Sequence, residues 1–201
     1  GGRAKKGSIY EGGLRVPAIL QWPAKYQARQ VETPVFSADI YPTLIAVGRA
    51  KVDHQTPLDG INLDAVISGA QTTRPGMGFW HGFRDGQGTW SDRIIKALME
   101  AKLAGKPNPH PERILKNVNV FPDFESLDSR GHAAWNAWPW KLHRIENRGK
   151  VKYELYHLVN DPMEAKDLSQ QEPERVRELT TALQEWQQSV LKSWSGADYR
   201  H

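Results

Sequence analysis

The run KKGSIYEGGLRVPAILQWP, residues 5–23, places a polar turn directly ahead of an apolar segment. Its paired glycines, Gly12 and Gly13, permit positive φ angles and a close approach of the backbone. The apolar part, Val16 to Trp22, predicts a short buried strand like those of a parallel sheet, with Pro17 tolerated near its start. A turn needs only one glycine, so we expect the polar residues around the glycines to serve a site.

Composition narrows the classes of function. The chain has 201 residues, 39% of them hydrophobic and 25% charged, which suits one soluble domain or one and a half. The net charge of +4 is scattered along the chain, so no nucleic-acid partner is expected. No apolar run approaches the ~18 residues of a membrane span, and no membrane partner is expected.

The absence of cysteine excludes disulfides and a thiol nucleophile. Because the chain opens without Met or a signal peptide, we expect it to be a piece of a longer protein.

The first third of the chain has helical signals after the predicted strand. Residues 37–47 predict a helix, with Ser37 as its N-cap and Gly48 as its stop. Residues 61–69 predict a second, shorter helix that ends at Gly69. The order of strand, helix, turn and helix is typical of the closing part of an α/β sheet.

Beyond about residue 75 the pattern changes to strands that alternate with turns, and to two further helices. Residues 78–86 predict a strand that runs into a turn, and residues 92–104 predict a helix that stops at Gly105. An antiparallel hairpin is predicted from two segments, the second half of residues 132–145 and the whole of residues 152–159. An apolar stripe from Val176 to Val190 predicts a long final helix, which opens with capping-box spacing at Ser169 and Glu172.

Four segments in this order resemble one enzyme family. They are KGSIYEGGLRVPAILQWP, DIYPTL, Asp59-Gly60 and ELYHLVNDPMEAKDL. The chain resembles the C-terminal part of a sulfatase, an arylsulfatase-like member of the alkaline phosphatase superfamily. The resemblance implies an α/β fold in two parts. Residues 1–75 would be the terminal strand and helix units of an alkaline-phosphatase-like sheet, and residues 76–201 a small antiparallel-sheet subdomain with a packed long helix.

The resemblance also implies a reaction, the hydrolysis of a sulfate ester. Sulfatases use a formylglycine nucleophile made from Cys or Ser in a C/S-x-P-x-R motif, beside a Ca²⁺ ion held by Asp and Asn. Neither that motif nor the metal ligands occur in this sequence. Both would lie upstream in the parent enzyme, so the isolated chain is expected to be inactive. One catalytic position carries over: Lys6 resembles the sulfate-binding lysine.

The residues themselves leave two interpretations of Lys6 open. An ammonium with three donors at the entrance of a glycine-rich turn can reach a tetrahedral anion. Most Lys-Lys pairs, however, are simply solvated at a surface. The resemblance favours the first interpretation for Lys6 and leaves Lys5 on the surface.

Three further residues are candidates for substrate binding: His81, His132 and Trp135. Each histidine lies beside a glycine, where it could hydrogen-bond a substrate hydroxyl or protonate a leaving oxygen, or belong to a strand-end network. The indole of Trp135 could stack on a sugar or aryl ring, or pack the sheet onto a helix. Lys141 and Arg144 could face an anionic substrate or line an exposed edge. No histidine pair has metal-ligand spacing, so no metal site is predicted in this chain.

The expected partners are a sulfated small molecule or glycan and the missing N-terminal part of the same protein. Two alternatives stay open. One is a non-catalytic module, rich in tryptophan, that binds a carbohydrate or a protein partner. The other is a related phosphoester or phosphonate hydrolase of the same superfamily. For the parent, the resemblance to exported bacterial sulfatases implies a periplasmic or secreted location.

Overall fold

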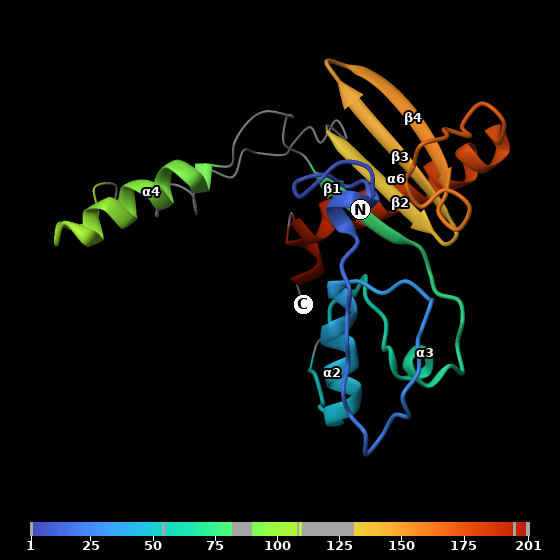
Figure 1. The fold of residues 1–201 in the computed structure, drawn as a ribbon, viewed down its shortest axis with the longest axis horizontal. Coiled ribbons are helices and arrows are strands. Elements are labelled where there is room, and N and C mark those ends of the chain that lie inside the picture. Colours follow the sequence, from blue (N-terminus) through green and yellow to red (C-terminus); the bar gives the residue numbers. More distant parts are fainter. Residues whose placement is uncertain are drawn as a thin grey trace. The chain divides into compact units, whose positions relative to one another are not determined.

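The computed structural model describes residues 2–53, 55–81, 90–107, 109, 131–194 and 196–199. The chain divides into two compact units, residues 1–81 together with 131–201, and residues 82–130. In the second unit the structure describes helix α4, Trp90–Leu103 (Figure 1). The chain leaves α4 through Gly105, which has a φ of 62°. This confirms the predicted helix and its glycine stop.

The first unit contains a four-stranded antiparallel sheet with the strand order β1-β2-β3-β4 (Figure 1). The strands are β1 Met77–His81, β2 His132–Ala137, β3 Trp140–Asn147 and β4 Lys150–His157. The predicted antiparallel sheet is therefore confirmed. Strand character was predicted only for the second half of residues 132–145, whereas the first half also forms a strand. Because the strands are antiparallel neighbours, side chains alternate between two faces along each of them.

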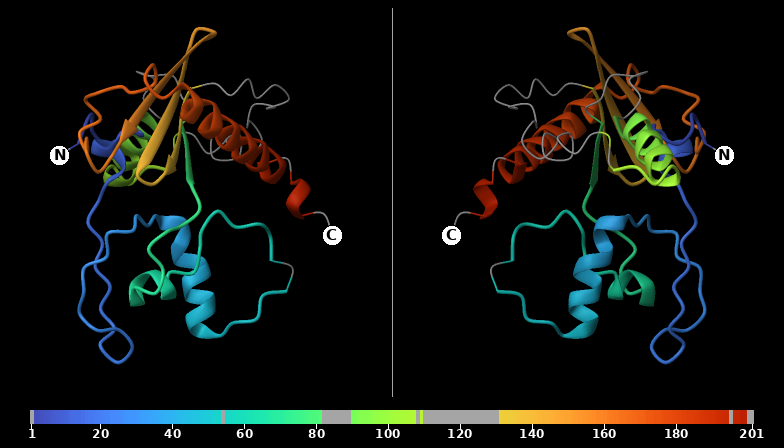
Figure 2. Two further views of the ribbon diagram at one scale, coloured as in Figure 1. Left: turned by 90° about the vertical axis from the view of Figure 1, so that its right-hand side faces the viewer. Right: turned by 90° about the vertical axis from the view of Figure 1, so that its left-hand side faces the viewer.

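A long helix, α6 (Pro173–Trp194), packs on one face of this sheet and is followed by the short 3₁₀ helix η2, Ala197–Tyr199 (Figure 2). The helix begins one residue after Glu172, so Pro173 takes the first helical position, where its missing N–H costs nothing. The predicted capping box is therefore wrong, because Ser169 lies outside the helix. Leu142, Leu155 and Leu179 form the centre of the core between sheet and helix. The predicted apolar stripe thus covers the sheet, as expected.

Residues 16–75 contain the 3₁₀ turn η1 (Ser37–Asp39) and the helices α2 (Ile40–Gly48) and α3 (Asp64–Ser68). Both predicted helices are confirmed, but the predicted N-cap Ser37 is wrong, because Ser37 lies inside the 3₁₀ turn and the N-cap of α2 is Asp39. Gly69 caps α3 in the left-handed region, as expected, with a φ of 82°. At the end of α2 the left-handed residue is Arg49, with a φ of 51°, and Gly48 is the last helical residue. The stop of α2 is therefore one residue later than predicted.

The predicted strand at Val16 to Trp22 is wrong for the structure of this chain. The run has no regular secondary structure, and 76% of Val16 and 96% of Ile19 are exposed. A strand is stabilised by hydrogen bonds to its neighbours, and no described strand pairs with this run. An apolar sequence alone therefore did not suffice to make it part of a sheet.

A buried ion pair ties the α2 region together. The guanidinium of Arg74 donates to both carboxylate oxygens of Asp39, at 2.6 and 3.0 Å, and both side chains are almost fully buried. The same carboxylate accepts the backbone N–H groups of Phe36 and Ile61, each at 2.9 Å. Asp39 therefore joins three stretches of chain that are distant in sequence.

No helix among the described residues is both long and apolar enough to cross a membrane.

Candidate functional site

The candidate site starts at the turn that carries Lys6. The backbone N–H of Ser8 donates to the carbonyl oxygen of Lys5 at 3.1 Å, which closes a β-turn over Lys6 and Gly7. Gly7 has a φ of 93°, a value that the third position of a type II turn requires and that glycine adopts without strain. The short helix α1, Glu11–Leu14, follows directly.

The paired glycines explain how this turn is held. A Cβ atom at Gly12 would overlap the carbonyl oxygens of Arg3 and Ala4, and one at Gly13 would overlap the carbonyl oxygen of Ser8. The N–H of Gly12 also donates to the carbonyl of Arg3 at 2.9 Å. Helix α1 therefore packs directly against the backbone of residues 3–8. Only residues without a side chain allow so close an approach.

The side chain of Lys6 is exposed on this turn. Its ammonium has no hydrogen-bonded or ion-paired partner among the described residues, and the same is true of Lys5. By contrast, Arg3 and Lys141, the cations that contact this segment and the sheet below it, are both paired with carboxylates. The turn thus presents two cations that remain available to an anion.

The sheet face opposite α6 is polar and yet buried. Side chains of β3 and β4 that alternate with the apolar core residues lie on this face. They are Lys141, His143, Glu154 and Tyr156, each no more than 4% exposed. A buried charge is stable only if it is paired and hydrogen-bonded. The segment that contains α1 covers this face and supplies part of that pairing, on the side of the sheet away from α6 (Figure 2).

Three residues of the covering segment bind the polar face. The Arg3 guanidinium donates to the hydroxyl of Tyr156 at 2.7 Å, and the Tyr10 hydroxyl donates to Glu154 Oε2 at 2.7 Å. The Tyr10 ring also stacks on His143, with 4.4 Å between ring centroids. Lys141 Nζ donates to the Glu11 carboxylate at 2.7 Å. The segment around Lys6 is therefore fastened to the sheet at both of its ends.

The loop after β4 adds a second carboxylate, that of Glu164, which is fully buried. Its Oε1 accepts a hydrogen bond from His143 Nε2 at 2.7 Å and forms an ion pair with Lys141 Nζ at 3.1 Å. Its Oε2 accepts the backbone N–H of Glu11 at 2.5 Å. The oxygens of Asp161 accept the N–H groups of Ala165 and of the following residue, which shapes the loop that presents Glu164. The NDPMEAKDL run thus builds part of this network.

The carboxylates of the network are held in the ionised form. Burial by itself raises the pKa of Glu154, but hydrogen bonds from Lys152, Tyr10 and Tyr156 outweigh it and lower the pKa to about 2. Burial likewise acts to raise the pKa of Glu164, and the hydrogen bond from His143 and the charge of Lys141 lower it overall. Because its acceptor is an ionised carboxylate, Nε2 of His143 must carry a proton.

Two histidines of this face, His132 and His143, are neutral. Burial lowers the pKa of His143, and burial followed by the proximity of His143 lowers the pKa of His132 to about 3. With Nε2 protonated, His143 Nδ1 is an acceptor, and it receives a hydrogen bond from His132 Nε2 at 2.8 Å. A continuous chain of donors therefore runs from His132 through His143 to Glu164.

The structure brings some of the predicted site residues together and separates one from the others. His81 and His132 are direct partners across β1 and β2, so their side chains share the polar face. The ring of Tyr10, from the segment that carries Lys6, lies 5.0 Å from the ring of His132. Trp135 lies on the opposite face, where it packs on the core beside Trp186.

Sequence reasoning did not identify the buried network itself. Lys141 was expected to face an anionic substrate or to line an exposed edge, whereas it is fully buried and paired with Glu11 and Glu164. No role was predicted for Glu154, Glu164 or His143. A signal was present in the alternation of charged or polar with apolar residues in KLH (141–143) and ELY (154–156). Alternation predicts two faces, but it does not reveal that a separate segment covers the polar one.

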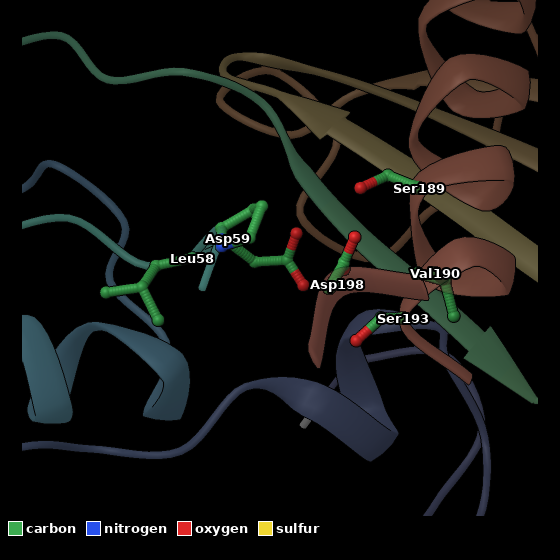
Figure 3. Close-up of a pocket in the computed structure, with 7 residues that line it drawn as sticks. Leu58, Asp59, Ser189, Val190, Ser193 and Asp198 are labelled. Atoms are coloured by element: carbon green, nitrogen blue, oxygen red, sulfur yellow. The ribbon is translucent and has the colours of Figure 1, made fainter. Parts of the chain in front are cut away.

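A hollow of about 480 Å³ lies elsewhere in the first unit, between the loop at residues 57–59 and the end of α6 (Figure 3). The oxygen-bearing side chains around it are those of Asp59, Ser189, Ser193 and Asp198. Asp59 also accepts the indole N–H of Trp186 at 3.0 Å. Two carboxylates would repel an anion, so this hollow is unsuited to a sulfate group.

Comparisons with known proteins identify similar sequences. The chain is 35% identical over 74 residues to arylsulfatase G of Rattus norvegicus, which covers 36% of this chain and 14% of that protein. It is 39% identical over 70 residues to human arylsulfatase H, which covers 34% of this chain and 12% of that protein. With human steryl-sulfatase it shares 37% identity over 65 residues, 32% of this chain and 11% of that protein. No protein-family model matches the chain.

Among solved structures, the chain matches a Bacteroides thetaiotaomicron protein described under the metabolism of multiple glycosaminoglycans. The TM-score is 0.57 at 22% sequence identity, with 92% of this chain and 31% of that chain covered. This match supports the fold, because it extends over nearly all of the chain. The chain spans only a small part of the length of the curated relatives it matches. The chain is therefore similar to sulfatases in sequence over part of its length, and it shares the fold of the Bacteroides thetaiotaomicron protein over most of its length.

Proposed function

We propose that this chain is the C-terminal portion of a sulfatase, and that Lys6 binds the sulfate group of the substrate. The observation that carries the proposal is an exposed ammonium that has no partner among the described residues, on a turn that is otherwise fixed by glycine contacts and a buried ion network. A surface lysine needs no such support. The sequence similarity to sulfatases supports sulfate as the proposed tetrahedral anion.

The reaction of the whole enzyme would be attack of a nucleophile on sulfur with cleavage of the S–O bond to the substrate oxygen. Charge redistributes over the sulfuryl oxygens during such a transfer, and a fixed cation stabilises them. In this role Lys6 donates N–H hydrogen bonds to a non-bridging oxygen. A point charge suits this task because the ammonium can follow the oxygen as the geometry changes.

Calcium and formylglycine are typical of sulfatases, and the residues of this chain do not fit either group. No cluster of three or more His, Asp or Glu side chains suited to a metal occurs among the described residues. The sequence contains neither cysteine nor a Ser-x-Pro-x-Arg motif. We therefore infer that the nucleophile and the Ca²⁺ ligands belong to the remainder of a longer chain, and we assign no step through them here.

His81 and His132 are proposed to lie on the substrate side of the same site, because they share the sheet face that the Lys6 segment covers. Trp135 has a different environment: its ring packs so closely on Gly76 that a Cβ atom there would overlap it. A sulfated small molecule or glycan remains the proposed substrate class. No observation favours the tryptophan-rich binding module, since Trp135, Trp140 and Trp186 are engaged in internal packing.

The test of this function uses the full-length protein that contains the chain. Lys6→Ala is expected to lower kcat/KM for an aryl sulfate on the order of 10²–10³-fold, the usual effect of losing one charge-stabilising donor. Lys5→Ala is the matched control, because Lys5 is the adjacent exposed lysine and also lacks a partner among the described residues. Its turnover is expected to stay near that of the wild type. Equal effects of the two substitutions, or none, would remove Lys6 from the site.

The 201-residue chain by itself is expected to show no turnover of an aryl sulfate, since it lacks a nucleophile of the required kind. The assay compares hydrolysis by the purified chain with that in buffer. Clear activity that depends on the chain would contradict the proposed division of roles.

A further inference from the structure

The ammonium of Lys141 is completely buried, and it lies between two carboxylates. It is 2.7 Å from Glu11 Oε1 and 3.1 Å from Glu164 Oε1. Lys141 belongs to the sheet, whereas the carboxylates come from two segments that lie over it. A fully buried lysine is rare unless it is paired, and here a single cation joins three separate parts of the chain.

The Glu164 carboxylate has more partners than the single cation of a simple ion pair. Besides the bond from Lys141, its carboxylate accepts hydrogen bonds from His143 Nε2 and from the N–H of Glu11. Its backbone is in the left-handed region, with a φ of 52°. That conformation is unfavourable for a residue with a side chain, so the surrounding contacts must hold it. Strain of this kind is concentrated at functional sites.

The position of Glu11 is transmitted to the turn that carries Lys6. Glu11 begins α1, and its two bonds to the network involve both its backbone N–H and its carboxylate. The next two residues, Gly12 and Gly13, touch the backbone of residues 3–8 without an intervening side chain. Backbone in direct contact cannot absorb a shift by changing rotamers. A displacement of Glu11 therefore displaces the turn as well.

We propose that Lys141 and Glu164 are positioning residues, which hold the Lys6 turn at a fixed place over the sheet. The proposal rests on the assignment of Lys6 as the sulfate-binding residue. The cations of the network are Arg3, Lys141 and Lys152, and its anions are Glu11, Glu154 and Glu164. With both histidines neutral these charges balance, so the network adds no net charge of its own beneath the anion-binding lysine.

The experiment begins with the 201-residue chain and avoids a lone buried charge. Lys141→Met by itself would leave two carboxylates facing each other, and the variant could fail to fold for that reason. The double variant Lys141→Met/Glu11→Gln removes one charge of each sign and leaves Glu164 its bonds from His143 and from the Glu11 backbone. Lys25→Met is the matched control, since it breaks a Lys–Asp ion pair at the surface.

Amide hydrogen exchange measured by NMR reports the position of the turn directly. The N–H groups of Ser8 and Gly12 close the turn and its contact with Arg3. In the double variant their exchange is expected to accelerate on the order of tenfold or more, while the amide of Leu142, in the inner strand β3, keeps its wild-type rate. The control should leave all three rates unchanged. Unchanged exchange at Ser8 and Gly12 in the double variant would overturn the proposal.

Kinetics of the full-length protein then distinguish a displacement of Lys6 from a general loss of structure. A misplacement of about 1 Å can cost on the order of 10²-fold in rate, so the double variant should lower kcat/KM on the order of 10–10²-fold. If the loss acts through Lys6, it should largely disappear in a Lys6→Ala background. A loss that adds in full to that of Lys6→Ala would overturn the proposal. If instead the turn loosens while Lys6→Ala retains wild-type turnover, the positioning stands and the proposed function fails.

Discussion

At the scale of single residues, Gly13 illustrates how one missing side chain sets the geometry of the candidate site. A Cβ atom at this position would overlap the carbonyl oxygen of Ser8. Gly13→Ala should therefore push α1 away from the Lys6 turn and destabilise the chain by about 1–3 kcal/mol, measured by urea unfolding. Gly48→Ala is the control: nothing lies within 4 Å of a Cβ there, and its position in α2 favours alanine. Equal stabilities of the two variants would show that the close approach is unimportant.

The buried histidines predict how stability depends on pH. The folded state keeps His132 neutral down to about pH 3, whereas the unfolded chain takes up a proton below its ordinary pKa of 6.5. Its contribution is thus fully present above pH 6.5 and is lost as the pH falls toward 3, by up to about 1.4 kcal/mol per pH unit. His143, whose pKa is also lowered, acts in the same direction. The charged and titratable groups that face this pair are Tyr10, Lys141, Glu154, Tyr156 and Glu164, together with His81, the direct partner of His132 across β1 and β2.

Urea unfolding at pH 7.5, 6.0 and 5.0 measures this dependence. His132→Gln should reduce the slope between pH 6.5 and 5, because one of the two buried neutral imidazoles is then absent. The carboxylate of Glu154 does not obscure the result. Its pKa of about 2 in the folded state lies below the ordinary 4.5, so its contribution is lost only as the pH falls from 4.5 toward 2. A stability that does not change from pH 7.5 to 5.0 would contradict the neutral assignment.

At the scale of secondary structure, periodicity predicted the elements that have a packed apolar side. The stripe from Val176 onward predicted α6, and the turn signals predicted α3 with its cap at Gly69. The same reasoning was wrong for Val16 to Trp22, because an apolar run becomes a strand only where partners exist. It also missed the polar face of the sheet. Lys141 and Glu164 are 23 positions apart in sequence, and no local pattern reveals that a loop brings them together.

The pairing of Asp39 with Arg74 gives a prediction for the α2 region. Arg74→Met would leave the Asp39 carboxylate buried with only two backbone N–H donors. The loss should be about 3–5 kcal/mol by urea unfolding, the usual cost of removing one partner from a buried pair. Arg177→Met is the matched control, because Arg177 pairs with Glu174 on the exposed side of α6. If both substitutions cost the same, the buried pair does not join the α2 region as described.

At the scale of the whole molecule, the second unit is an insertion between two paired strands. Strand β1 ends at His81, β2 begins at His132, and these two residues are direct partners in the sheet. The ends of the insertion therefore leave and re-enter the first unit at adjacent points. Residues 82–130 are assigned to a unit of their own, so we expect the register of the sheet to persist without them. Tight hairpins join strand ends of this kind.

Replacing residues 82–130 with Pro-Asp should therefore preserve the sheet. The new connection would be Pro-Asp-Gly131, a type I turn followed by a left-handed residue, and Gly131 already has a φ of 87°. A shorter loop costs less entropy to close. The free energy of unfolding measured in urea should therefore equal or exceed that of the full chain. A second variant, with ten Gly and Ser residues in place of 82–130, tests removal of the unit without a designed turn. Loss of cooperative unfolding in both variants would mean that residues 82–130 are needed to hold β1 on the sheet, and that the first unit is not independent of the second.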